Sequence, residues 1–89
     1  MTRLAGARAV VTGGSSGIGL ATARLLRARG AEVCLLARER ARLEAAAREV
    51  GADTLCADLG DPDDTERAAV RLVDLAPDLV VHCAGTGLA

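Results

Sequence analysis

Residues 9–19 form a short apolar run that passes directly into a glycine-rich turn and then into a segment typical of a helix. Gly13 lets the chain turn sharply out of the expected strand, and Gly17 keeps side chains away from the backbone where a pyrophosphate would approach. Gly19 lets the new helix pack close to the sheet. The start of that helix offers unpaired N–H groups to phosphates. The segment predicts a dinucleotide site, with a turn that binds nothing as the alternative.

Apolar runs alternate with amphipathic segments along the chain. The runs are continuously apolar, which is typical of parallel strands covered on both faces. Right-handed crossovers between them predict an α/β fold, a Rossmann-type parallel sheet of order 3-2-1-4 with flanking helices, truncated after strand four. Gly30 and Gly51 are expected helix stops, and Asp61 followed by Pro62 is an expected helix start. We expect strands at 8–12, 32–37, 54–57 and 79–83, and helices at 16–29, 39–50 and 61–75.

Length and composition restrict the other possibilities. The 89 residues suffice for one small domain, 1–89, and a content of 51% hydrophobic and 26% charged residues is that of a globular protein. A net charge of -1, with scattered arginines, gives no reason to expect nucleic acid or a membrane surface. No apolar run approaches a membrane span or a signal peptide, so we expect a cytoplasmic protein. We expect three buried, unpaired core cysteines that bind no metal: Cys34, Cys56 and Cys83.

Three motifs resemble those of the short-chain dehydrogenase/reductase family, in its amino-terminal half. Residues 12–19 match the family's T-G-x-x-x-G-x-G fingerprint, Asp58-Leu59 resembles its adenine-contacting pair, and residues 82–85 resemble its N-N-A-G element. Asp58 has the alternative role of starting its loop, and the two serines of the turn could be ordinary turn residues. The resemblance, together with the end of the second expected strand, implies these cofactor-binding residues: Gly13, Ser15, Ser16, Gly17, Ile18, Gly19, Arg38, Asp58, Leu59, Cys83, Ala84 and Gly85.

The residue that recognises the adenosine ribose of the cofactor is expected at the end of the second strand. In the family an acid at this place selects NAD, whereas an arginine pairs with the 2′-phosphate of NADP. Ala37 stands in the place of the acid and Arg38 follows it, which resembles NADP-preferring members and suits bidentate phosphate binding. We expect NADP, with NAD less favoured. Glu39 is the competing candidate for contact with the ribose, although we interpret it as an acid that complements the dipole at a helix start. The alternative for Arg38 is a solvated loop residue.

The family's residues for hydride transfer are absent from this sequence. The resemblance implies a tyrosine, a lysine four residues later and a serine, but the sequence has no tyrosine or lysine, and its two serines lie in the expected phosphate loop. We therefore assign no catalytic residue and no metal ligand. The expected function is the NADP(H)-binding portion of an oxidoreductase, inactive as an isolated chain. A non-enzymatic nucleotide-binding or regulatory module is the alternative.

The fourth expected strand raises two further expectations. His82 and Cys83 stand where the family has two asparagines, and we interpret His82 as a partly buried strand residue with one hydrogen-bonded nitrogen, with a chemical role as the alternative. The strand is also expected to be an apolar edge with unpaired backbone groups. We therefore expect a complementary chain, or self-association, at this edge.

Overall fold

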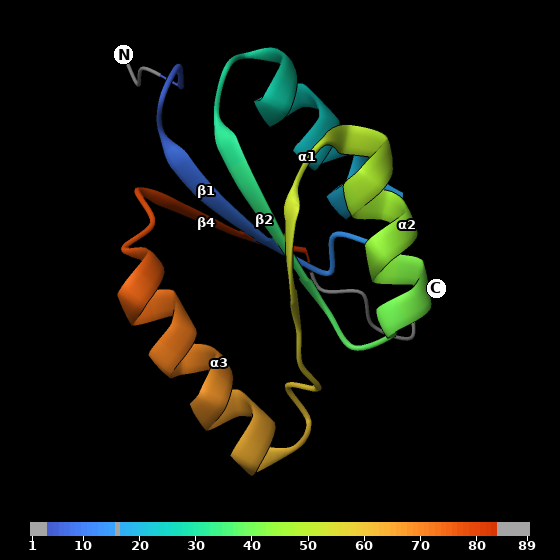
Figure 1. Cartoon of the computed structure of the whole chain (residues 1–89), viewed down its shortest axis with the longest axis vertical. Helices are drawn as coiled ribbons and strands as arrows, with labels where there is room; N and C mark the ends of the chain where they lie inside the picture. Colours follow the sequence, from blue (N-terminus) through green and yellow to red (C-terminus); the bar gives the residue numbers. More distant parts are fainter. Residues whose placement is uncertain (1–3, 16, 84–89) are drawn as a thin grey trace.

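Figure 1 shows a parallel sheet with helices on both of its faces. The structure, a computed structural model, describes residues 4–15 and 17–83. Its elements in chain order are β1 (Arg8–Thr12), α1 (Gly17–Ala28), β2 (Glu32–Ala37), α2 (Arg40–Val50), β3 (Asp53–Cys56), α3 (Pro62–Leu75) and β4 (Leu79–His82).

The four strands have the order β3-β2-β1-β4, and every neighbouring pair is parallel. The predicted order 3-2-1-4 is therefore confirmed. Val10 of β1 lies opposite Cys34 of β2 and Val80 of β4. Helices α1 and α2 cover one face, and α3 lies on the other (Figure 1). Because the strands are parallel, their carboxyl ends meet at one edge of the sheet, where α/β folds bind their ligands.

The ends of several elements differ from the expected ones by one residue. Helix α2 begins at Arg40 because Glu39 has extended backbone angles, φ −94 and ψ 103, and serves as the N-cap. Strand β3 lies one residue earlier than expected, and β4 ends at His82, although the N–H of Cys83 still donates to the carbonyl of Thr12. The expected start of α3 is confirmed, since the carboxylate of Asp61 accepts the N–H of Asp63.

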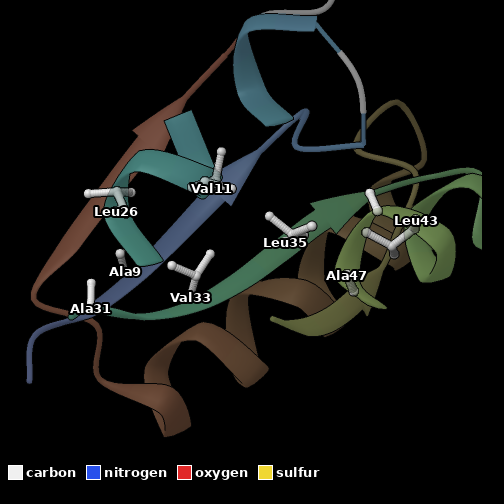
Figure 2. Close-up of a cluster of buried hydrophobic side chains, with 10 residues drawn as sticks. Ala9, Val11, Leu26, Ala31, Val33, Leu35, Leu43 and Ala47 are labelled. Atoms are coloured by element: carbon white, nitrogen blue, oxygen red, sulfur yellow. The ribbon is translucent and has the colours of Figure 1, made fainter. Parts of the chain in front are cut away.

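The main core lies between the sheet and the helices α1 and α2, and it is aliphatic throughout (Figure 2). Alternate strand residues such as Val11 and Leu35, both fully buried, point into it from β1 and β2. The expected apolar face of α2 supplies Leu43, Ala46 and Ala47. This layer holds the strand ends in place beside the glycine-rich turn.

The opposite face of the sheet is covered more thinly. Its buried cluster consists of Leu36, Ala57 and Ala68, and Ala68 is the one buried residue of α3. Val73 of α3 is 77% exposed, and Val80 of β4 is 53% exposed. Apolar surface therefore remains open on the α3 side of the molecule. None of the helices in the described ranges has the length and apolar character needed to cross a membrane.

The expectation of three buried cysteines is wrong for two of them. All three thiols are free, and Cys34 is buried in the middle of β2, where burial, reinforced by the charge of Asp53, raises its pKa. Cys56 and Cys83 are only partly buried. Cys56 ends the edge strand β3, and Cys83 lies just beyond β4, so each has an open side that the interior strand β2 does not have.

Candidate cofactor-binding site

The glycine-rich turn connects β1 to α1 at the carboxyl edge of the sheet. Gly13 has φ 72, and its N–H donates to the carbonyl of Leu36 at 2.8 Å. A Cβ atom at Gly13 would collide with the backbone carbonyl oxygen of Cys83. Both its left-handed backbone angle and its close neighbour therefore require glycine at the turn, as the sequence predicts.

Gly17 and Gly19 differ in what surrounds them. Gly17 has φ 60, and a Cβ atom there would have no neighbour within 4 Å among the described residues. It is the first residue of α1, so the space beside it lies at the positive end of the helix dipole. A Cβ atom at Gly19 would collide with the carbonyl oxygen of Gly13. Gly19 therefore lets α1 pack closely against the turn, whereas the sequence predicts close packing against the sheet. The turn thus has close backbone neighbours at Gly13 and Gly19 and no described neighbour beside Gly17.

Gly14 is a residue for which the sequence analysis assigned no role. A Cβ atom there would lie 2.8 Å from the side chain of Leu35. Because it occupies a variable position of the fingerprint, the motif itself carries no signal for this packing role. Gly14 brings the turn against β2, from which Arg38 follows.

A hollow of about 520 Å³ opens beside the turn, over the carboxyl ends of the strands. Several of the residues predicted to bind the cofactor line it: Gly13, Ser15, Arg38, Asp58, Leu59 and Cys83. Gly17, Ile18 and Gly19 lie in the first turn of α1, next to the glycine-rich turn, and Ile18 is 76% exposed. Ser16, Ala84 and Gly85 lie outside the described residues. The structure therefore places most of the predicted residues it describes around one hollow.

Charged side chains from the segment after β2 border this hollow. Arg38 is exposed there and forms no ion pair with another described residue. Glu39 stands at the start of α2 as predicted, but its side chain makes no capping hydrogen bond. Its carboxylate instead lies 4.0 Å from the guanidinium of Arg42, a residue of the same wall that the sequence analysis missed. The sequence signal that could have identified Arg42 is its spacing of three residues from Glu39, which places the two side chains side by side on a helix.

Asp58 takes part in its own loop. Its Oδ1 accepts the N–H of Gly60 at 2.9 Å, and its backbone N–H donates to Oδ2 of Asp64 at 3.0 Å. The alternative interpretation, that Asp58 starts the loop before α3, therefore describes the structure. Asp58 also lines the hollow, and its contact with an adenine group stays a prediction.

His82 joins β4 to β1 at the floor of the hollow. Its Nδ1 lies 2.6 Å from Oγ1 of Thr12, its opposite neighbour across the two strands, in a side-chain hydrogen bond. The predicted single hydrogen-bonded nitrogen is therefore present. The expectation of a partly buried ring is wrong, because His82 is exposed on the thinly covered face of the sheet. Thr12 is buried, so this hydrogen bond satisfies a hydroxyl inside the protein.

Comparison with known proteins agrees with this architecture. The sequence pattern of the family described as short chain dehydrogenase matches residues 7–89. The chain belongs to this family. The match includes the glycine-rich turn, all four strands and the segment after β4. The predicted resemblance to the amino-terminal half of this family is thereby confirmed.

Two relatives illustrate the extent of the similarity. The chain is 44% identical over 87 residues to L-xylulose reductase of Homo sapiens, covering 96% of this chain and 34% of that protein. The crystal structure of L-sorbose reductase from Gluconobacter frateurii, complexed with NADPH and L-sorbose, matches with a TM-score of 0.79 at 36% identity. That match covers 92% of this chain and 34% of the other. The chain thus spans about a third of the length of these relatives.

A third match concerns the fold. A solved structure described as a short chain dehydrogenase/reductase family protein aligns with a TM-score of 0.86 at 44% identity, over 96% of this chain and 36% of that one. The Rossmann-type sheet with its flanking helices is therefore an arrangement that the chain shares with this member of its family.

Proposed function

We propose that the chain binds NADP(H) as the cofactor-binding portion of an oxidoreductase. The observation that carries the proposal is the open side of Gly17 at the start of α1, next to a hollow that Arg38 borders. The turn would hold the pyrophosphate with backbone N–H groups, because a side chain at Gly17 would take the space that the phosphates need. When bound, NADP(H) supplies the hydride chemistry through its nicotinamide.

Arg38 is the residue that we propose selects the cofactor. It is exposed at the end of β2, on the wall of the hollow, and no other described residue forms an ion pair with it. Its guanidinium can therefore pair with a 2′-phosphate without first giving up a carboxylate partner. NAD lacks this phosphate, so the charge of Arg38 would not increase its affinity for the chain. NADPH in the L-sorbose reductase structure supports the assignment by analogy.

This proposal predicts a measurable preference. NADP should bind the chain about tenfold more tightly than NAD, because one charge-assisted hydrogen bond distinguishes them. Arg38→Ala should remove most of that difference and leave NAD binding nearly unchanged. Calorimetric titration of both cofactors measures the ratio. Arg29→Ala, which removes an exposed arginine after α1 that does not line the hollow, is the matched control. Equal affinities in the unmodified chain would contradict the proposal.

The chemistry of hydride transfer requires residues that this sequence does not contain. It has no tyrosine and no lysine to donate or hold the proton in the manner of the family. The proposed role of the described residues is therefore to bind and orient the cofactor. A second segment that supplies a proton donor would be needed for turnover by that route.

We also propose that the outer edge of β4 pairs with a further strand, from a complementary chain or from a second copy. Among the described strands β4 has a neighbour on one side only, so its other side offers unpaired backbone groups. Val80, 53% exposed, adds apolar surface on the same strand. Exposed apolar area of this kind beside an open edge favours association.

The purified chain should accordingly sediment with a mass that rises with concentration. Val80→Asp should shift it toward the monomer, because the new charge opposes burial of this strand. Leu25→Asp is the matched control, since Leu25 is also 53% exposed but belongs to α1, which covers the face of the sheet opposite to α3 (Figure 1). A chain that stays monomeric at all concentrations would contradict self-association.

A further inference from the structure

Arg42 is a second arginine on the wall of the hollow. It lies in the first turn of α2, four residues after Arg38 and three after Glu39. All three side chains line the same hollow. The end of β2 and the start of α2 therefore present two positive charges and one negative charge to any molecule bound there.

The arginines in the first turn of α2 have the opposite sign to the charge that stabilises the start of a helix. The first turn contains no acidic residue, and it carries Arg40 and Arg42 at the positive end of the helix dipole. Glu39, at the N-cap, makes no side-chain hydrogen bond to the free N–H groups of the helix. The stability of α2 alone therefore does not account for Arg42. An anion held in the hollow would be attracted by Arg42 and by the helix start together.

The contact between Glu39 and Arg42 is weak enough to be exchanged. The carboxylate and the guanidinium are 4.0 Å apart, and the side chains are 58% and 61% exposed, respectively. Exposed pairs at this separation contribute little to stability and are screened by salt. A phosphate with two negative charges would compete effectively with one carboxylate for the same guanidinium.

We propose that Arg42 is a second cationic contact for the 2′-phosphate and that Glu39 limits its availability. The inference rests on the proposed function, because it concerns the same nucleotide site. With a 2′-phosphate present, Arg42 leaves Glu39 and joins Arg38 on the phosphate. With a 2′-hydroxyl present, Arg42 stays with Glu39, whose carboxylate is the acceptor that a ribose hydroxyl would use. The Glu39–Arg42 pair is thus a specificity determinant beside Arg38.

Two small nucleotides isolate this contribution. Adenosine 2′,5′-bisphosphate carries the 2′-phosphate, and 5′-AMP lacks it. Arg42→Ala should lower the affinity for the bisphosphate about threefold and leave that for 5′-AMP nearly unchanged, because an exposed contact for which Glu39 competes adds less than that of Arg38. Arg42→Lys should recover part of the loss, since the charge returns without the planar fork. Glu39→Gln should raise the affinity for the bisphosphate about threefold by removing a competing negative charge.

The matched control is Arg48→Ala, an exposed arginine in the last turn of the same helix that does not line the hollow. It should change neither affinity, and circular dichroism should show the same helix content in all variants. If Arg42→Ala keeps the full preference for the bisphosphate, the inference is overturned while the role of Arg38 stands. If the unmodified chain binds neither nucleotide, the proposed function itself fails, and this inference fails with it.

Discussion

Replacing Gly17 with valine should weaken NADP binding by more than about a hundredfold, the largest change in affinity that the structure predicts. Gly17 begins α1, and a Cβ atom there would enter open space on the outer side of the turn. That space is where we propose that the pyrophosphate approaches the backbone N–H groups. The branched side chain would occupy it and keep the phosphates at a distance from their donors.

Backbone strain must be separated from loss of the site, because Gly17 has a positive φ of 60. Gly6 is the matched control. It has φ 80, a Cβ atom there would also have no neighbour within 4 Å in the part of the chain that the structure describes, and it does not line the hollow. Gly6→Val should therefore lose stability to a similar extent but keep its affinity for NADP. Thermal unfolding and calorimetric titration of both variants provide the comparison. Equal affinities of the two variants would show that the turn does not contact the cofactor.

Gly19→Ala should have the largest effect on folding, a loss of about 3 kcal/mol in the free energy of unfolding, at the upper end for an overpacked site. The added methyl group would collide with the carbonyl oxygen of Gly13, which is backbone and cannot rotate away. Elsewhere inside a helix the same substitution stabilises a protein by about 1 kcal/mol, because alanine has the higher helix propensity. A loss of stability in Gly19→Ala would therefore be opposite in sign to the gain expected from helix propensity alone.

Urea unfolding followed by circular dichroism measures this difference. Gly60→Ala is a suitable control, because a Cβ atom there would meet only a carboxylate oxygen of Asp58, at 3.2 Å. Its stability should stay within about 1 kcal/mol of the unmodified chain, as for most exposed substitutions. A Gly19→Ala variant as stable as Gly60→Ala would mean that α1 does not pack against the turn in the way described.

The fold could be predicted from the sequence because local signals and the overall pattern agree. Continuous apolar runs marked the parallel strands, and Gly30, Gly51 and Asp61 marked helix ends that the structure confirms. The predicted and observed ends of the helices and strands differ by one residue at most. They arise where a residue such as Glu39 is a half-helical cap whose backbone angles depend on the loop before it.

The candidate site could be predicted only in part. Motif positions identified the glycine turn, Arg38 and Asp58, which lie at or beside one hollow. Arg42 was missed because the motif ends before α2, and its orientation depends on where that helix begins. The exposure of His82 was missed because sequence alternation does not reveal how thinly α3 covers the sheet.

The most direct test of the proposed cofactor site is the titration of the isotopically labelled, unmodified chain with NADP and with NAD, followed by the amide resonances of its backbone. We expect NADP to bind more tightly, by about tenfold. The largest shifts should occur at Gly13, Gly17 and Arg38, and those of Gly51, at the far end of α2, should stay unchanged. Saturable binding that moves these three amides would support the site. No saturable binding, or shifts confined to other parts of the chain, would contradict it.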